Sequence, residues 1–163
     1  MKKKDLRLYN LILPVWLLLA MPQLWVVVLP ANFFIDLGVL WLTMKHLGIE
    51  NRRAVWGKTI RRVWIWGFLA DFVGAGMMLV WNIWDVTDSG FLMSVNYNPF
   101  QRLDAFLWVT ACVAVTGLIL YLGNRRFCLK DLPVTPEQRN SLAWSLSVFT
   151  APWLFYLPTA WFW

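Results

Sequence analysis

Long stretches without a charge place the strongest constraint on how this chain folds. Residues 8–29 form an uncharged run of 22 residues, and further apolar segments follow at 31–47, 63–84, 103–123 and 141–161. A helix needs about 20 mostly apolar residues to cross the roughly 30 Å hydrocarbon core of a bilayer. We therefore predict an all-α integral membrane protein, a single domain built as a bundle of five transmembrane helices.

The composition supports this class and argues against others. Hydrophobic residues make up 60% of the chain and charged residues 15%, whereas an ordinary soluble domain has about 25% charged residues. So much apolar side chain is incompatible with disorder. The positive charge lies beside apolar segments rather than on a folded polar surface, so we expect no nucleic-acid partner.

The basic residues predict the topology. Lysine and arginine number 15, and all but Arg102 lie before residue 8, between residues 45 and 62, or between residues 125 and 139. Because cytoplasmic loops of membrane proteins are enriched in Lys and Arg, we assign loops 48–62 and 124–140 to the cytoplasm and loop 85–102 to the outside. The chain is then a multi-pass protein of the cytoplasmic membrane, with its N-terminus cytoplasmic and its C-terminus extracytoplasmic. We expect Pro30 to interrupt the helical structure and so to separate the first two helices.

Two acidic residues fall inside predicted membrane helices, Asp36 in the second and Asp71 in the third. Acids inside membrane helices are costly and are by default functional candidates. At a rise of about 1.5 Å per residue the two carboxyl groups lie ~10 Å apart in depth, so we do not expect a carboxylate dyad. One hypothesis is that Asp71, with Asp36 as a second candidate, binds a cation or carries a proton.

Other polar residues recur on the same helix faces as the acids. Helical spacing predicts a polar seam between the second, third and fifth helices, formed with the acids by Asn32, Thr43, Asn82 and Ser145. A purely structural role is the alternative. In it, a protonated Asp71 donates to Thr43 or Ser145, and Asp36 pairs with Arg102.

Small residues on the third helix permit close helix approach. They are Gly67, Ala70, Gly74 and Ala75, of which Ala70 and Gly74 have small-xxx-small spacing. This face packs either within the chain or against a second copy or a partner membrane subunit.

Basic and aromatic residues supply the remaining candidates. A short amphipathic helix is expected on the inner membrane surface, contacting anionic inner-leaflet lipids or an acidic partner through Arg52, Arg53, Lys58, Arg61 and Arg62. Three tryptophans lie deep in the predicted bundle and are candidates for a lipophilic-ligand pocket: Trp16, Trp41 and Trp153.

No motif of a known catalytic class occurs, and with one histidine and two cysteines the chain has few metal ligands. We therefore expect no enzyme, metal site or cofactor. The leading hypothesis is a small transport-type protein that handles an ion, a proton or a small solute through the polar seam, as an oligomer or with a partner subunit. The alternatives are a non-catalytic subunit or scaffold of a larger complex and a membrane protein that binds a lipophilic ligand.

Overall fold

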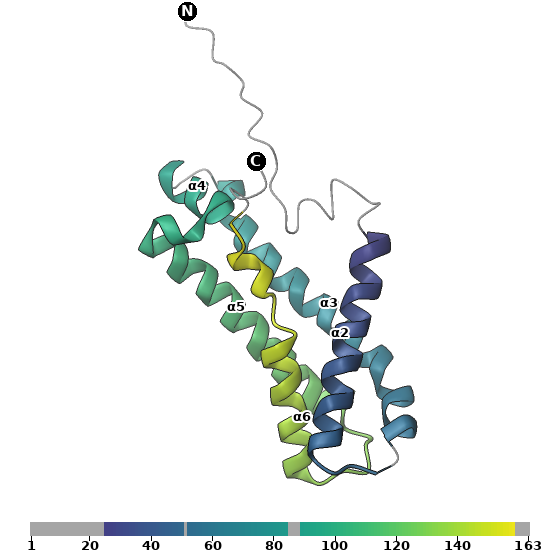
Figure 1. Cartoon of the computed structure of the whole chain (residues 1–163). Coiled ribbons are helices and arrows are strands. Elements are labelled where there is room, and N and C mark those ends of the chain that lie inside the picture. The colour runs from purple at the N-terminus through teal and green to yellow at the C-terminus, as the bar shows by residue number, and fades with distance from the viewer. Residues whose placement is uncertain (1–24, 51, 85–88, 159–163) are drawn as a thin grey trace, which may run out of the picture.

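The computed structural model describes residues 25–50, 52–84 and 89–158 (Figure 1). These residues form helices and turns, and no strand occurs among them. The long helices are α2 (Trp25–His46), α3 (Arg52–Trp84), α5 (Leu103–Gly123) and α6 (Pro136–Phe149). Shorter elements join or extend them: α4 (Ser89–Tyr97), η2 (Pro99–Gln101), η3 (Asn124–Cys128) and η4 (Trp153–Tyr156). The predicted all-helical class is confirmed for the described residues.

The four long helices alternate in direction, and this brings the basic segments together. The end of α2, the start of α3, η3 and the start of α6 all lie at the lower end of the molecule in Figure 1. Two side-chain hydrogen bonds connect segments at this end. Arg62 of α3 donates to Asp131 at 2.6 Å, and Gln138 Nε2 of α6 donates to the Leu47 carbonyl at 3.4 Å. We call it the basic end.

Two of the described segments, Thr59–Trp81 and Leu103–Cys128, are long and apolar enough to cross a membrane. Only 28% and 33% of the residues in their most apolar windows are buried in the molecule. A core helix of a soluble protein would be mostly buried, so these exposed apolar surfaces are compatible with a lipid surrounding.

The predicted break at Pro30 is wrong, because α2 continues through this residue from Trp25 to His46. Proline removes a single backbone hydrogen bond, and its ring is exposed here rather than pressed against a neighbour. Membrane-type helices often tolerate such an interruption. Residues 25–29 therefore belong to α2, and the rest of the predicted first helix lies outside the described residues.

The basic segment before the third predicted span is not a separate surface helix. It forms the first turns of α3, which extends without a break over 33 residues. Val55, Thr59, Ile60 and Val63 are buried, whereas Arg53, Arg61 and Arg62 are exposed. The segment therefore has one packed face and one charged face. Its packed face contacts the rest of the molecule, so the segment forms part of α3 rather than a separate helix. The predicted outer loop 85–102 likewise contains α4 and η2.

The last predicted span is interrupted. Helix α6 begins earlier than predicted, at Pro136, and ends at Phe149, after which the chain turns into η4. Pro152 has no N–H to donate to the Val148 carbonyl. The indole of Trp153 donates to that carbonyl instead, at 2.8 Å. A continuous helix over 141–161 is therefore wrong for the described part of this range.

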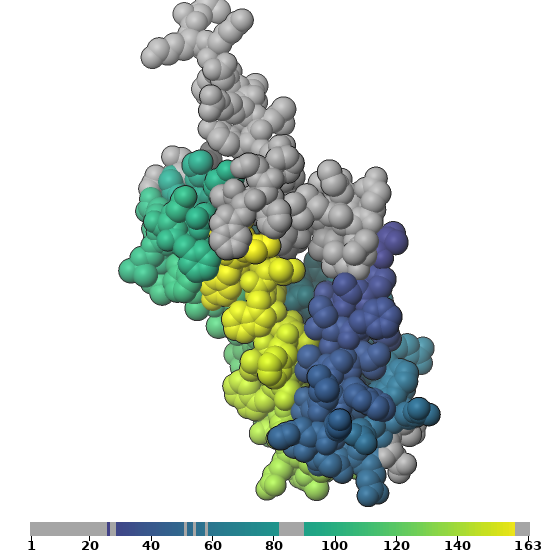
Figure 2. All heavy atoms as spheres, viewed as in Figure 1, coloured from purple at the N-terminus to yellow at the C-terminus, as the bar shows by residue number. Residues whose placement is uncertain are grey.

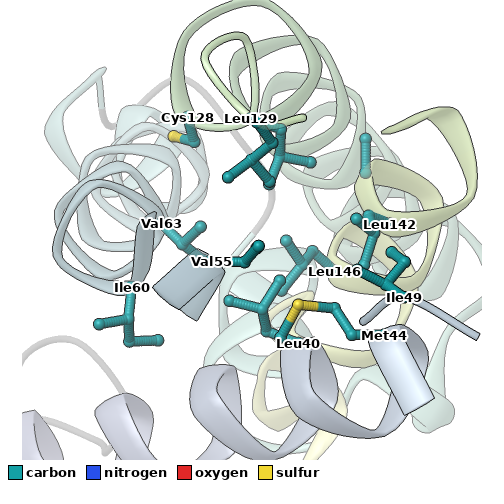
Figure 3. Close-up of a cluster of buried hydrophobic side chains, with 12 residues drawn as sticks. Leu40, Met44, Ile49, Val55, Ile60, Val63, Cys128, Leu129, Leu142 and Leu146 are labelled. Carbon is teal, nitrogen blue, oxygen red and sulfur yellow. The ribbon is translucent and has the colours of Figure 1, made fainter. Parts of the chain in front are cut away.

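Two apolar clusters form the core. The lower cluster, at the basic end, joins Leu40 and Met44 of α2 to Val63 of α3 and to Leu142 and Leu146 of α6, whose side chains point toward one another in Figure 3. The upper cluster joins α3, α4, α5 and η4, and includes Ala75, Met78, Val109, Cys112 and Phe155. Figure 2 shows α2 and α6 side by side on one face of the molecule, in agreement with their contacts.

Candidate functional site

A layer of polar side chains separates the two apolar clusters. On α3, Asp71 lies between Val63 of the lower cluster and Ala75 of the upper one. Thr116 on α5 and Ser147 on α6 also lie between residues of the upper and lower clusters along the chain, and both are buried. On α2, Asp36 is buried and faces Gly67 of α3, although Phe33 and Leu37 on either side of it pack against the lower cluster. We call Asp36, Asp71, Thr116 and Ser147 the polar layer.

Asp36 approaches α3 about one helical turn before Asp71. A Cβ atom added at Gly67 would lie 3.6 Å from Asp36 Oδ2, so Asp36 faces Gly67. Asp71 follows Gly67 by four residues, a rise of about 6 Å along α3. The predicted separation of ~10 Å in depth assumed parallel helices and an α2 that started at residue 31, whereas α2 already includes Trp25 and α3 crosses behind it at an angle (Figure 1).

Both acids are poorly solvated. Asp36 is 6% exposed, and Asp71 Oδ1 is buried without a hydrogen-bond partner among the described residues. Most buried polar atoms in proteins have such a partner, and a missing one costs about 1–3 kcal/mol. The layer therefore holds acceptor capacity that the described protein groups leave unused.

The partners that the sequence suggested for these acids are not those in the structure. Thr43 and Ser145 are half-buried beside Met44 and Leu146 of the lower cluster, and neither donates to Asp71 Oδ1. Arg102 forms an ion pair with Asp104 at 2.8 Å rather than with Asp36. Asn32 lies on α2 one turn before Asp36, and the Asn82 side chain lies outside the described part of the structure.

Sequence reasoning missed Thr116 and Ser147. Their hydroxyl groups donate to carbonyls of their own helices, Thr116 to Cys112 at 2.8 Å and Ser147 to Trp144 at 2.9 Å. Each oxygen retains lone pairs that can accept a further hydrogen bond or contact a cation. A hydroxyl that bonds its own helix is common in apolar helices, so the sequence alone gave no sign of a site.

The small residues of α3 pack within the chain. A Cβ atom at Gly74 would overlap Thr116 Oγ1 and lie 3.1 Å from the Phe155 ring. Ala70 and Ala75 are buried as well. Close approach of α3 to α5 at Gly74 therefore brings Thr116 to the helix face that also carries Asp71.

The predicted basic and aromatic residues lie apart from the polar layer. The Arg52 guanidinium lies 5.5 Å from the centre of the Trp41 ring, and Arg53 and Arg61 are exposed. Arg62 hydrogen-bonds Asp131 and lowers the pKa of that exposed carboxyl group. The Lys58 side chain and Trp16 lie outside the described parts.

Of the tryptophans predicted to line a pocket, Trp41 and Trp153 pack in different parts of the molecule. Trp41 packs against the lower cluster, whereas Trp153 is exposed and stacks on Tyr156, which packs against the upper cluster. Trp153 also donates to the Val148 carbonyl, so its ring position follows from the end of α6.

No group of three or more His, Cys, Asp and Glu side chains suited to a metal ion occurs among the described residues.

Comparisons with known proteins find no matching family model, no similar curated protein and no similar solved structure.

Proposed function

We propose that this chain is a multi-pass protein of the cytoplasmic membrane, with the basic end in the cytoplasm. The apolar, largely exposed surfaces of Thr59–Trp81 and Leu103–Cys128 support a lipid surrounding. The gathering of the basic segments at one end supports the orientation, because membrane proteins retain Lys and Arg on the cytoplasmic side.

We further propose that the chain is transport-type and that Asp36 and Asp71 together bind a proton or a monovalent cation. The observation that supports this function best is the presence of two poorly solvated carboxyl groups about one helical turn apart on the packed helices α2 and α3, one of them with an unpartnered oxygen among the described residues. Two like charges held close in an apolar surrounding repel strongly. A proton or a bound cation relieves that repulsion, so the occupied state of the pair is favoured.

The Thr116 hydroxyl group supplies a neutral oxygen atom close to the face of α3 that carries Asp71. Thr116 Oγ1 lies against α3 at Gly74, three residues from Asp71. Residues three apart on a helix share a face. In this proposal Asp71 holds the ion or proton, Asp36 adjusts its affinity, and Thr116 offers an additional ligand.

The test is flux through purified protein in liposomes. The full chain is reconstituted with the pH-sensitive dye pyranine, and proton, Na⁺, K⁺ and Li⁺ gradients are applied in turn. We expect flux of protons or of one cation, and we expect Asp71→Asn and Asp36→Asn to reduce it on the order of tenfold or more, because each removes a charge of the pair. Asp131→Asn, which changes an exposed acid, is the matched control and retains the flux.

Circular dichroism and size-exclusion chromatography verify that each variant folds. Absence of flux for every ion tested, or unchanged flux in both acid variants, contradicts the transport proposal. Absence of flux together with stable co-purification of another membrane protein supports instead a subunit or scaffold role.

A further inference from the structure

An open apolar groove of about 450 Å³ lies between α2 and the start of α3, at the basic end of the molecule. Its lining residues are Phe34, Leu37, Gly38, Trp41, Leu42, Arg53 and Trp56. Residues 34 and 42 are eight apart, so the groove follows α2 for about 12 Å. It is separate from the polar layer, and the inference below does not rest on ion binding.

The groove has one charged end. Arg53 is the only charged residue in its lining, and the Arg52 guanidinium lies over the ring of Trp41, which also lines it. The only acid between residues 45 and 62 is Glu50. A ligand that complements this site has an apolar chain and a negatively charged group at one end.

We propose that this groove binds an anionic phospholipid of the inner leaflet, with one acyl chain along Leu37 and Gly38 and the phosphate at Arg53. The lipid matches both the apolar lining and the arginine charge. The other available occupant, the segment 1–24, carries Lys2, Lys3, Lys4 and Arg7 against a single acid in its first seven residues. The start of that segment would bring further positive charge to Arg53, and its uncharged remainder, residues 8–24, has no anionic group to pair with the arginine, so charge complementarity favours the lipid.

Gly38 offers a way to block the groove without disturbing the fold. A Cβ atom added at Gly38 meets no atom within 4 Å, so Gly38→Leu extends a side chain into free space. Gly76 on α3 is equally open and lies away from the groove lining, so Gly76→Leu is the matched control.

Native mass spectrometry of the full chain measures the lipids that remain bound. The protein is purified in detergent with phosphatidylglycerol or with phosphatidylcholine of the same acyl chains. We expect the anionic lipid to be retained about fivefold more than the zwitterionic one, and Arg53→Gln to abolish this preference. Gly38→Leu lowers retention of both lipids, and Gly76→Leu does not. Competition with inorganic phosphate leaves retention unchanged if the acyl chain is bound as well.

Three outcomes overturn the proposal. One is equal retention of the two lipids by the unaltered chain, and another is unchanged retention in Gly38→Leu. The third comes from placing p-benzoylphenylalanine, a photo-crosslinking residue, at the exposed position Leu42. Crosslinks to a peptide from residues 1–24 rather than to a phospholipid would show that the chain itself fills the groove.

Discussion

At the scale of single residues, Asp71 occupies an unfavourable position among the described residues. Its Oδ1 atom is buried with no donor among the described residues, and the charge of Asp36 lies close by. If Asp71 served only to hold helices together, its oxygens would be expected to accept bonds from neighbouring helices. Stability measurements therefore separate the binding role from the structural one.

We predict that Asp71→Asn raises the stability of the protein by about 1 kcal/mol, because it removes like-charge repulsion while preserving side-chain volume. Thermal unfolding in detergent, followed by circular dichroism, measures this change. Asp104→Asn is the control, since it alters an exposed pair with Arg102 and should change the midpoint little. A clear loss of stability in Asp71→Asn would contradict the binding role.

The contact between Gly123 and Trp66 gives a second prediction at this scale. A Cβ atom at Gly123 would overlap the Trp66 indole, whose N–H donates to the Ile119 carbonyl at 3.0 Å. We predict that Gly123→Ala destabilises the protein by about 1–3 kcal/mol through overpacking. Gly76→Ala, in open space on α3, should be neutral or slightly stabilising. Equal unfolding midpoints for the two variants would refute this interpretation of the contact.

The sequence identified both acids but not their arrangement. Acidic residues in apolar helices are conspicuous, so Asp36 and Asp71 were found from position alone. Their proximity depends on where α2 begins and on how α3 crosses it, and neither follows from hydropathy. Thr116 was missed for a different reason. Its hydroxyl group donates to the Cys112 carbonyl of its own helix, and only the close packing of α5 against α3 at Gly74 brings it to the site.

At the scale of helices, the start of α6 is fixed by a capping box. Thr135 Oγ1 accepts from the Gln138 N–H, and Gln138 Oε1 accepts from the Thr135 N–H, both at 3.1 Å. The same Gln138 side chain donates to the Leu47 carbonyl after α2. The capping box therefore fixes the N-terminus of α6, and the Gln138 side chain also joins α6 to the end of α2.

Thr135→Ala should lower stability by about 1 kcal/mol, because it leaves a helix N–H without its acceptor. Thr135→Ser keeps the hydroxyl group and is the matched control, with a loss expected to be much smaller. Denaturant unfolding in detergent, followed by circular dichroism, compares the two variants. If they lose the same stability, the threonine methyl group rather than the cap accounts for the effect.

Helix type could be predicted from the sequence far better than helix ends. Apolar length correctly indicated helices over the described segments. Proline had opposite effects at two positions, however: α2 passes through Pro30, while α6 ends shortly before Pro152. At Pro152 the neighbouring Trp153 indole takes the carbonyl that the proline leaves free, a contact between residues five apart in the sequence. Hydropathy and proline position alone do not predict that side-chain contact.

At the scale of the whole molecule, the proposed topology can be tested by labelling from one side of the membrane. The native cysteines Cys112 and Cys128 are buried, so their background reaction with a membrane-impermeant maleimide should be low. We predict that Glu50→Cys and Lys130→Cys, both at exposed positions of the basic end, are labelled only from the cytoplasmic side. Gln101→Cys, exposed in η2, is labelled only from outside. Labelling of all three from the same side would contradict the topology.

The early end of α6 has an electrical consequence for the polar layer. The peptide dipoles of an α-helix add up to about half a negative charge at its C-terminus. Helix α6 ends at Phe149, two residues after Ser147, so this partial charge lies next to Ser147 of the polar layer. A helix that continued to residue 161 would carry the charge about 18 Å further along its axis. The interrupted helix thus adds a negative electrostatic potential, supplied by the backbone alone, to the region around Ser147.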